Sequence, residues 1–512
     1  MSRTFKVLVL LMLVVAATVA VVTAQTPAKI KVTVDASVAK ESLSGRLLIF
    51  MKKDDGKTVQ SIEPDFADPN AVFISGTEIT NLSTTKTVVI DADVNAFPAP
   101  FSTMNAGNYQ LFALLDRDHS YTYGGIGEGD VYSHVTKVTM PSSGVEVKLD
   151  KVVPPAVVHV PDSVKLVEFV SPMLSAFWGR PIQMKAAVML PPSYSKSPQQ
   201  KYPTIYNVTG YGGTRYSRLS QAVAMQKQMA DGTLPEMINV YLESQVPLGH
   251  SVWADSANNG PWGTALEKEF IPYLEKMFRM DAKPSGRFLT GHSSGGWATL
   301  WVMVTHPDFF GGTWSTSPDP VDFRSFTGPD ITKDPPQNIY QDQNGKEYNL
   351  VRDSGKELMT VRQYAEQEHV LGVYGGQFAS FNAVFSPKGD DGQPMMLFDV
   401  ETGRVDPAVQ AAWQKYNIRK LLVDNWKTLG PKLKGKIHIV VGTADTFHLN
   451  EPVQLLDAEL KKLGSDAKIE YIPGRTHFDL YVMGADQEGL LKRFQWEMYK
   501  IARPKALQAA AK

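Results

Sequence analysis

The sequence predicts an α/β protein in which a mostly parallel sheet carries helices on both faces and follows a separate domain of β-strands. From about residue 29 to 151, short runs rich in β-branched and aromatic residues are separated by Gly, Asp, Asn and Pro. From about residue 164 onward, short apolar runs alternate with longer helical segments, which is typical of a parallel sheet with helical crossovers. The chain has 512 residues, too many for one ordinary domain.

Residues 1–24 have the layout of a secretory signal peptide. Arg3 and Lys6 precede an apolar run at 7–22, and the small residues that follow predict cleavage after Ala24. An uncleaved membrane anchor is the alternative, although the apolar run is short for a full span. The chain has no cysteine, which excludes disulfides and fits a bacterial periplasm or growth medium. We therefore expect a periplasmic or secreted bacterial protein without a membrane span after cleavage.

The β-strand pattern defines the next domain, residues 25–151. Its runs, such as "IKVTVDAS" and "GVEVKLDKV", often alternate apolar with polar residues, and no long helical period interrupts them. This pattern predicts an antiparallel sandwich of immunoglobulin-like type. The Pro-rich stretch at 152–163 is the expected linker to the remainder of the chain.

The composition indicates neither a nucleic-acid partner nor a cofactor. The formal net charge is −1, so the chain carries no excess of basic residues for a phosphate backbone. One acidic cluster in the β domain could form a calcium site, but solvated turn carboxylates are the preferred interpretation. The cluster consists of Asp116, Asp118, Glu128 and Asp130. We therefore predict no metal and no cofactor.

The catalytic domain is predicted at 164–505. It begins with a hairpin and then alternates strands with helices, except for a cap-like insertion at about 318–435 that is too long for a simple connection. The expected strands are 164–171, 182–194, 202–210, 237–244, 287–291, 311–317, 436–442 and 467–474. The expected helices are 218–232, 263–280, 295–306, 451–464, 486–502 and, within the insertion, 407–429.

The stretch "RFLTGHSSGGWATLW" contains the pattern G-x-S-x-G at 291–295. A predicted strand runs directly into it and a predicted helix follows, which is the context of a nucleophile on a sharp strand-to-helix turn. Ser293 is the candidate nucleophile. Ser294 occupies the next position, where its backbone N–H can face a developing oxyanion. A glycine-rich turn without chemistry is the alternative.

A serine nucleophile needs a histidine base and an acid that orients it. Of the five histidines after Ser293, His477 lies in a loop after the last strand and before the last helix. Asp445 lies in the loop after the preceding strand, within "VGTADT". Asp479 and Glu451 are the alternatives for the acid. The chain order Ser, Asp, His is the one expected for this type of site.

The loop "NVTGYGG" after the strand at 202–210 is expected to provide the second oxyanion donor. The N–H of Tyr211 is the first candidate, and Gly212 the next, because glycine lets the backbone approach a substrate oxygen closely. His292 and Trp253 are candidate substrate contacts, as is Gly212. For Trp253 the alternative is ordinary packing of its loop onto the core.

Several motifs together resemble the putative-esterase family of α/β-hydrolases. These are "AAVMLPPSY", "YPTIYNVTGYGG", "GHSSGGWATLWVMVTHPDFFGGTWSTSP", "VGTADT" and "PGRTH", which span about residues 165 to 500. The family includes esterase D, enterochelin esterase, feruloyl and acetyl-xylan esterases, and the antigen 85 mycolyltransferases. The resemblance implies an α/β-hydrolase fold, a triad of Ser293, Asp445 and His477, and an oxyanion hole formed by the amides of Tyr211 and Ser294. Thr209 and the long insertion depart from the family pattern, which leaves the substrate open.

The expected function is therefore that of an exported serine esterase. Its substrate would be a small-molecule or carbohydrate-linked ester, for example on a polysaccharide or a siderophore. An acyltransferase of antigen 85 type is one alternative, and a serine peptidase another. A catalytically inactive surface binding protein is a third. The sequence does not indicate the oligomeric state.

Overall fold

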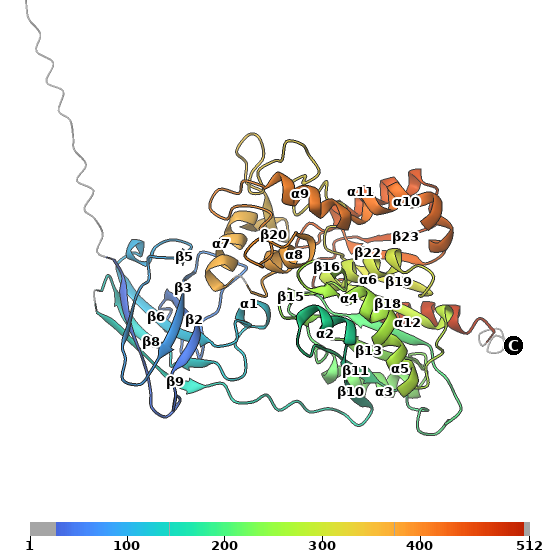
Figure 1. The fold of residues 1–512 in the computed structure, drawn as a ribbon, viewed down its shortest axis with the longest axis horizontal. Helices are drawn as coiled ribbons and strands as arrows, with labels where there is room; N and C mark the ends of the chain where they lie inside the picture. Colours follow the sequence, from blue (N-terminus) through green and yellow to red (C-terminus); the bar gives the residue numbers. More distant parts are fainter. Residues whose placement is uncertain (1–26, 143, 373, 506–512) are drawn as a thin grey trace, which may run out of the picture.

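The structure is a computed structural model that describes residues 27–142, 144–372 and 374–505 (Figure 1). The predicted signal peptide, residues 1–24, lies outside the described residues. None of the helices within the described ranges is long and apolar enough to cross a membrane.

The N-terminal domain is built from β-strands, as predicted. Their hydrogen bonds join them into one nine-stranded sheet of order β4-β1-β9-β7-β6-β2-β3-β5, with β8 on β6. The pair β1–β9 is parallel, whereas the other pairs are antiparallel. The expectation of two separate sheets therefore does not match the observed pairing, and the immunoglobulin-like type stays a prediction. The strands are β1 (Lys29–Val34), β2 (Leu43–Lys53), β3 (Val72–Leu82), β4 (Val88–Asp91), β5 (Ala96–Phe97), β6 (Gly107–Asp116), β7 (Val131–Ser133), β8 (Thr136–Met140) and β9 (Val145–Val152).

The second sheet has eight strands in the order β10-β11-β13-β12-β18-β19-β22-β23. Only β11 pairs antiparallel with its neighbours, and the other pairs are parallel. This mostly parallel sheet agrees with the α/β-hydrolase architecture. The strands are β10 (Val164–Val170), β11 (Gln183–Met189), β12 (Thr204–Val208), β13 (Ile238–Leu242), β18 (Arg287–His292), β19 (Gly312–Thr316), β22 (Ile437–Gly442) and β23 (Lys468–Ile472).

Helices cover both faces of the second sheet, which is why its central strands are apolar along their whole length. Every residue of β13 and β22 is buried, so neither strand alternates between apolar and polar side chains. The covering helices include α3 (Ala222–Ala230), α5 (Ile271–Met277), α6 (Ser294–Thr305), α11 (Asn450–Lys462) and α12 (Gly489–Ala502). The predicted first hairpin exists, but α2 (Pro172–Trp178) lies within its connection.

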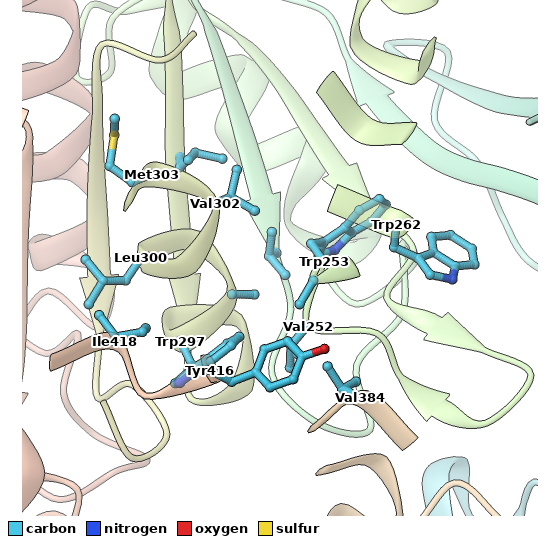
Figure 2. Packing of buried hydrophobic residues seen from close by; sticks show 14 of the residues in the cluster. Val252, Trp253, Trp262, Trp297, Leu300, Val302, Met303, Val384, Tyr416 and Ile418 are labelled. Atoms are coloured by element: carbon cyan, nitrogen blue, oxygen red, sulfur yellow. The ribbon is translucent and has the colours of Figure 1, made fainter. Parts of the chain in front are cut away.

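The core around α6 is the largest of the molecule. Figure 2 shows Trp297, Leu300 and Met303 of this helix among aromatic and aliphatic side chains from other elements. Because α6 is buried on nearly all sides, it is apolar around its whole circumference. This packing fixes the turn at the start of α6, where the candidate nucleophile lies.

The insertion forms a compact layer beside the second sheet and contacts the N-terminal domain (Figure 1). Its predicted helical stretch is α9 (Pro407–Trp413) followed by α10 (Ile418–Leu433). Two further helices, α7 (Val361–Leu371) and α8 (Gln377–Phe385), and the hairpin β20 (Asn349–Asp353) with β21 (Lys356–Thr360) occupy a region that the sequence suggested to be irregular.

Helix α7 joins the insertion to the N-terminal domain. Val370 and Leu371 at its end are buried in a core cluster with Phe50 and Phe112 of the β domain. The guanidinium of Arg46 donates hydrogen bonds to the carbonyl of Val370 at 2.7 and 3.1 Å. The two parts of the chain are therefore in close contact near the pocket described below.

Candidate active site

Ser293 lies between β18 and α6 on a sharp turn. Its backbone has φ 59° and ψ −124°, a conformation that is strained for a residue with a side chain. The flanking glycines are required by close approach: a Cβ on Gly291 would lie 2.2 Å from the carbonyl oxygen of Gly295. A Cβ on Gly295 would lie 2.2 Å from the carbonyl oxygen of Val208. The turn thus has the geometry expected of a nucleophile elbow.

His477 and Asp445 lie together on neighbouring loops after β23 and β22. Nδ1 of His477 is 3.0 Å from Oδ2 of Asp445, and both side chains are buried. The other oxygen of Asp445 accepts hydrogen bonds from the amides of Phe447 and Leu449 at 3.0 and 3.2 Å. Burial alone would raise the pKa of Asp445, but the hydrogen bond and charge of His477 outweigh it and lower that pKa. These contacts favour the anionic form of Asp445, which orients the imidazole of His477.

The hydroxyl of Ser293 faces a residue that the sequence did not single out. Its Oγ is 3.3 Å from Oδ1 of Asp319, and within the described residues no hydrogen bond joins it to His477. Ser293 and His477 nevertheless line the same cavity. Since a serine side chain changes rotamer readily, the hydroxyl can turn toward the imidazole when a substrate is bound.

Asp319 is a buried carboxyl beside the nucleophile. Its Oδ2 accepts a hydrogen bond from Oγ of Ser294 at 2.5 Å and one from Nε2 of Gln377 at 3.3 Å. Burial raises the pKa of Asp319 to about 6, against the lowering effect of the Ser294 hydrogen bond. The sequence signal was its position in "SPDP" directly after β19, at the carboxyl edge where sites of such sheets form. No triad role falls at this position, so sequence reasoning did not select it.

The loop at 209–213 lies beside the nucleophile, as expected for an oxyanion loop. A Cβ on Gly210 would lie 3.2 Å from Cβ of Ser293, so the two backbones nearly touch. Gly212 has φ +76°, which favours glycine. On the other side of Ser293, the amide of Ser294 is in the first turn of α6 and therefore has no acceptor within the helix.

Contacts with two other parts of the chain fix this loop. The hydroxyl of Tyr211 lies 2.5 Å from the carbonyl oxygen of Thr122 in the β domain and 2.7 Å from that of Gly375. The hydroxyl of Tyr123 donates to the carbonyl of Gly213 at 3.0 Å. The loop conformation thus depends on the short helix α1 (Tyr121–Gly124) of the N-terminal domain.

His250 supports the same loop from the catalytic domain. Its Nε2 is 3.0 Å from the carbonyl oxygen of Thr209. Burial lowers the pKa of His250 to about 4, so the ring is neutral at neutral pH and Nε2 is a donor.

A cavity of about 790 Å³ contains Ser293, Asp319 and His477. Three parts of the chain supply its walls near the nucleophile. The β domain supplies Glu63, Pro64, Phe66, Tyr121, Thr122 and Tyr123. The insertion supplies Tyr364, Gln367, Glu368, Leu371, Gln377, Phe378 and Phe381. The catalytic domain supplies Phe447 and Phe478, whose ring centroids lie 4.8 and 5.5 Å from that of His477. The walls are mostly apolar and aromatic, with a polar corner at Asp319.

The candidate substrate contacts differ in position. His292 and Gly212 line the cavity. The centroid of the His292 ring is 4.3 Å from that of His477, and burial together with the charge of His477 lowers the pKa of His292 to about 3. Trp253 is fully buried, packs edge-on against Trp262 and does not line the cavity (Figure 2). Its predicted substrate contact is therefore corrected to a packing role, because its loop folds into the core.

The residues considered as alternatives have other partners. Asp479 accepts from Arg475 at 2.9 Å, and Glu451 pairs with His448 at 3.3 Å. In the β domain, carboxylate oxygens of Asp116, Asp118 and Asp130 lie within 4.8 Å of one another. Asp116 and Asp130 accept hydrogen bonds from backbone amides of their own loop, as turn carboxylates do.

The model of the family described as "Putative esterase" matches residues 181–481. A search of curated proteins finds no match to the chain. A solved ferulic acid esterase is similar at 15% identity and a TM-score of 0.41, covering 66% of this chain and 97% of its own. An S-formylglutathione hydrolase from Agrobacterium tumefaciens is similar at 15% identity and a TM-score of 0.39, covering 66% of this chain and 95% of its own.

Proposed function

Since the chain belongs to the putative esterase family and is therefore a carboxylic ester hydrolase, we propose that it cleaves esters through an acyl-enzyme on Ser293. The observation that supports this proposal most strongly is the combination of the strained elbow at Ser293 with the buried pair of His477 and Asp445 in one cavity. A structural turn would need neither the strain nor the buried pair.

The proposed reaction begins when Oγ of Ser293 attacks the ester carbonyl and His477 accepts its proton. Asp445 accepts a hydrogen bond from Nδ1–H of His477, so Nε2 is the basic nitrogen. The carboxylate of Asp445 also stabilises the imidazolium that forms. The amides of Tyr211 and Ser294 would stabilise the oxyanion of the tetrahedral intermediate. His477 then protonates the leaving alcohol, and a water activated by the same imidazole releases the acid.

The shape of the cavity supports an ester with an apolar or aryl acyl group. Phe378, Phe381 and Phe478 provide flat apolar surface in the cavity that contains the nucleophile. Export to the periplasm or medium belongs to the same proposal and rests on residues 1–24 alone. Small-molecule, polysaccharide-linked and siderophore esters are the classes to be tested.

Labelling with a fluorophosphonate probe tests the nucleophile. We expect rapid labelling of the wild-type protein and none of Ser293→Ala. Ser294→Ala keeps its backbone N–H and should still be labelled, and the exposed Ser285→Ala is the matched control. Failure of the folded wild-type protein to react would refute the acyl-enzyme. Product analysis with an added acceptor alcohol then separates hydrolysis from acyl transfer.

A further inference from the structure

Asp319 is a buried carboxyl group that the proposed acyl-enzyme chemistry does not use. Its hydrogen-bond donors are the hydroxyls of Ser293 and Ser294 and the amide of Gln377, all uncharged. Across the described ranges, no lysine, arginine or histidine side chain forms an ion pair with it. A buried carboxylate without a cation is costly, and a partner that brings a positive charge would offset that cost.

The position of this carboxyl is unfavourable for the attack of Ser293 on an uncharged ester. An anion beside the nucleophile opposes the negative charge that develops on the substrate oxygen. It also accepts a hydrogen bond from the hydroxyl of Ser293, which would otherwise be directed at His477. Both effects would slow the reaction of an uncharged substrate, and both would be reversed by a substrate cation bound to Asp319.

We propose that Asp319 is a recognition site for an amino group carried by the acyl part of the substrate, on the carbon next to the scissile carbonyl. This inference rests on the proposed acyl-enzyme at Ser293. It narrows the substrate class to esters of α-amino acids. The side chain of the amino acid would lie against the aromatic rings that line the cavity, such as those of Phe378 and Phe381.

The distances support an α-amino group rather than a more remote one. Oδ1 of Asp319 is 3.3 Å from Oγ of Ser293, the atom to which the acyl carbon becomes bonded. A nitrogen on the α-carbon is two covalent bonds from that acyl carbon, so it can lie within the roughly 2.7–2.9 Å of a charge-assisted hydrogen bond to Oδ1. A cation several bonds further along an extended acyl chain would be carried away from Oδ1.

Binding of the amino group would also prepare the nucleophile. When an ammonium donates to Oδ1 of Asp319, the hydroxyl of Ser293 loses its present acceptor and can turn to His477. Oδ2 remains held by Ser294 and Gln377, so the carboxyl keeps its orientation. Substrate recognition and activation of Ser293 would thus occur at the same carboxyl.

Three methyl esters of nearly equal shape test this inference: those of phenylalanine, 3-phenyllactate and 3-phenylpropionate. They place an ammonium, a hydroxyl or a hydrogen on the α-carbon. We expect wild-type kcat/KM at pH 7 to be at least tenfold higher for the amino ester than for either other ester. Asp319→Asn should bring the three values within about threefold of one another, since the amide cannot pair with the ammonium.

Asp330→Asn is the control, because Asp330 lies in the same insertion but does not line the cavity, and its carboxylate accepts from the amide and the hydroxyl of Thr332. It should leave the ratio of the amino ester to 3-phenylpropionate unchanged. A wild-type enzyme that hydrolyses all three esters equally, or a preference that survives Asp319→Asn, would overturn the inference while leaving the acyl-enzyme intact. Loss of fluorophosphonate labelling in the wild type would instead overturn the acyl-enzyme.

A measurement on the wild type keeps the test independent of how the variant folds. Between pH 6 and 5 the α-ammonium, with a pKa of roughly 7–8, stays almost fully charged while Asp319 becomes protonated, so the preference for the amino ester should fall. The charges of His477, Asp445 and Tyr364 also act on Asp319, but they are common to the three esters and cancel in the ratio. A ratio that stays constant over this range would contradict the proposal.

Discussion

The hydrogen bond between His477 and Asp445 is the contact on which the proposed chemistry depends most. Asp445→Asn keeps the shape of the acid but can hold the wrong tautomer of the imidazole, so we expect kcat to fall by about 10⁴-fold. Steady-state hydrolysis of an aryl ester measures this. The control is Asp479→Asn, since Asp479 is on the same loop as His477 but pairs with Arg475 at the surface. Equal losses in the two variants would contradict the assignment of the acid.

Glu368 provides a prediction about stability and pH. Burial raises the pKa of Glu368 to about 7 from an ordinary value of 4.5. The folded state therefore binds this proton more tightly than the unfolded state, so the contribution of Glu368 to stability falls as pH rises from about 4.5 to 7. Relative to Glu368→Gln, the free energy of unfolding of the wild type should fall by on the order of 3 kcal/mol over this pH range. Denaturant unfolding at several pH values measures it, and a pH-independent difference would contradict the shift.

At the residue scale, the sequence predicts a site residue where both the residue type and its position after a strand are required by the chemistry. Ser293, Asp445 and His477 each follow a predicted strand, and parallel strands bring their carboxyl ends to one edge of the sheet. Asp319 follows a strand as well, but its role depends on which hydroxyls face it, and that is decided by packing. The prediction that Trp253 contacts the substrate was wrong for the same reason. The sequence does not show whether its loop lines the cavity or packs into the core.

The elbow makes a prediction at the scale of an element. In Gly295→Ala the new Cβ would lie 2.2 Å from the carbonyl oxygen of Val208, so β12, β18 and the start of α6 must move apart. We expect a loss of about 1–3 kcal/mol in unfolding free energy and at least a tenfold loss of kcat. Gly144→Ala is the control, because nothing lies within 4 Å of a Cβ at that position. Thermal unfolding and fluorophosphonate labelling rates measure the two effects.

The regular elements of the catalytic domain could be predicted, because each buries an apolar run of the right length and period. The helices α7 and α8 of the insertion could not. They are short, and α7 is stabilised by packing against the β domain, where Leu371 meets Phe50 and Phe112. The insertion around them is rich in Gly, Asp and Pro, which predicted an irregular stretch, although the two helices themselves contain none of these residues. The pairing of β1 with β9 into one sheet likewise depends on contacts that are distant in sequence.

For the whole molecule, the important contact is the one between the N-terminal domain and the oxyanion loop. Tyr123→Phe removes the hydrogen bond to the carbonyl of Gly213 and should lower kcat by about tenfold with little change in KM, because the amide of Tyr211 loses its fixed position. Tyr109→Phe is the control, since it removes a similar hydrogen bond, to Asn105, within the β domain. Unchanged kcat in Tyr123→Phe would show that the loop is held by other contacts alone.

One wall of the cavity, formed by residues 63–66 and 121–123, belongs to a domain that is joined to the catalytic domain by the stretch 152–163. None of the proposed catalytic side chains lies in that domain. Recombination of different β domains onto one catalytic domain would therefore replace part of the acyl-binding surface in a single step while leaving Ser293, Asp445 and His477 untouched. In this architecture, the substrate range can evolve through the β domain as long as its contacts with the oxyanion loop, made by Thr122 and Tyr123, are kept.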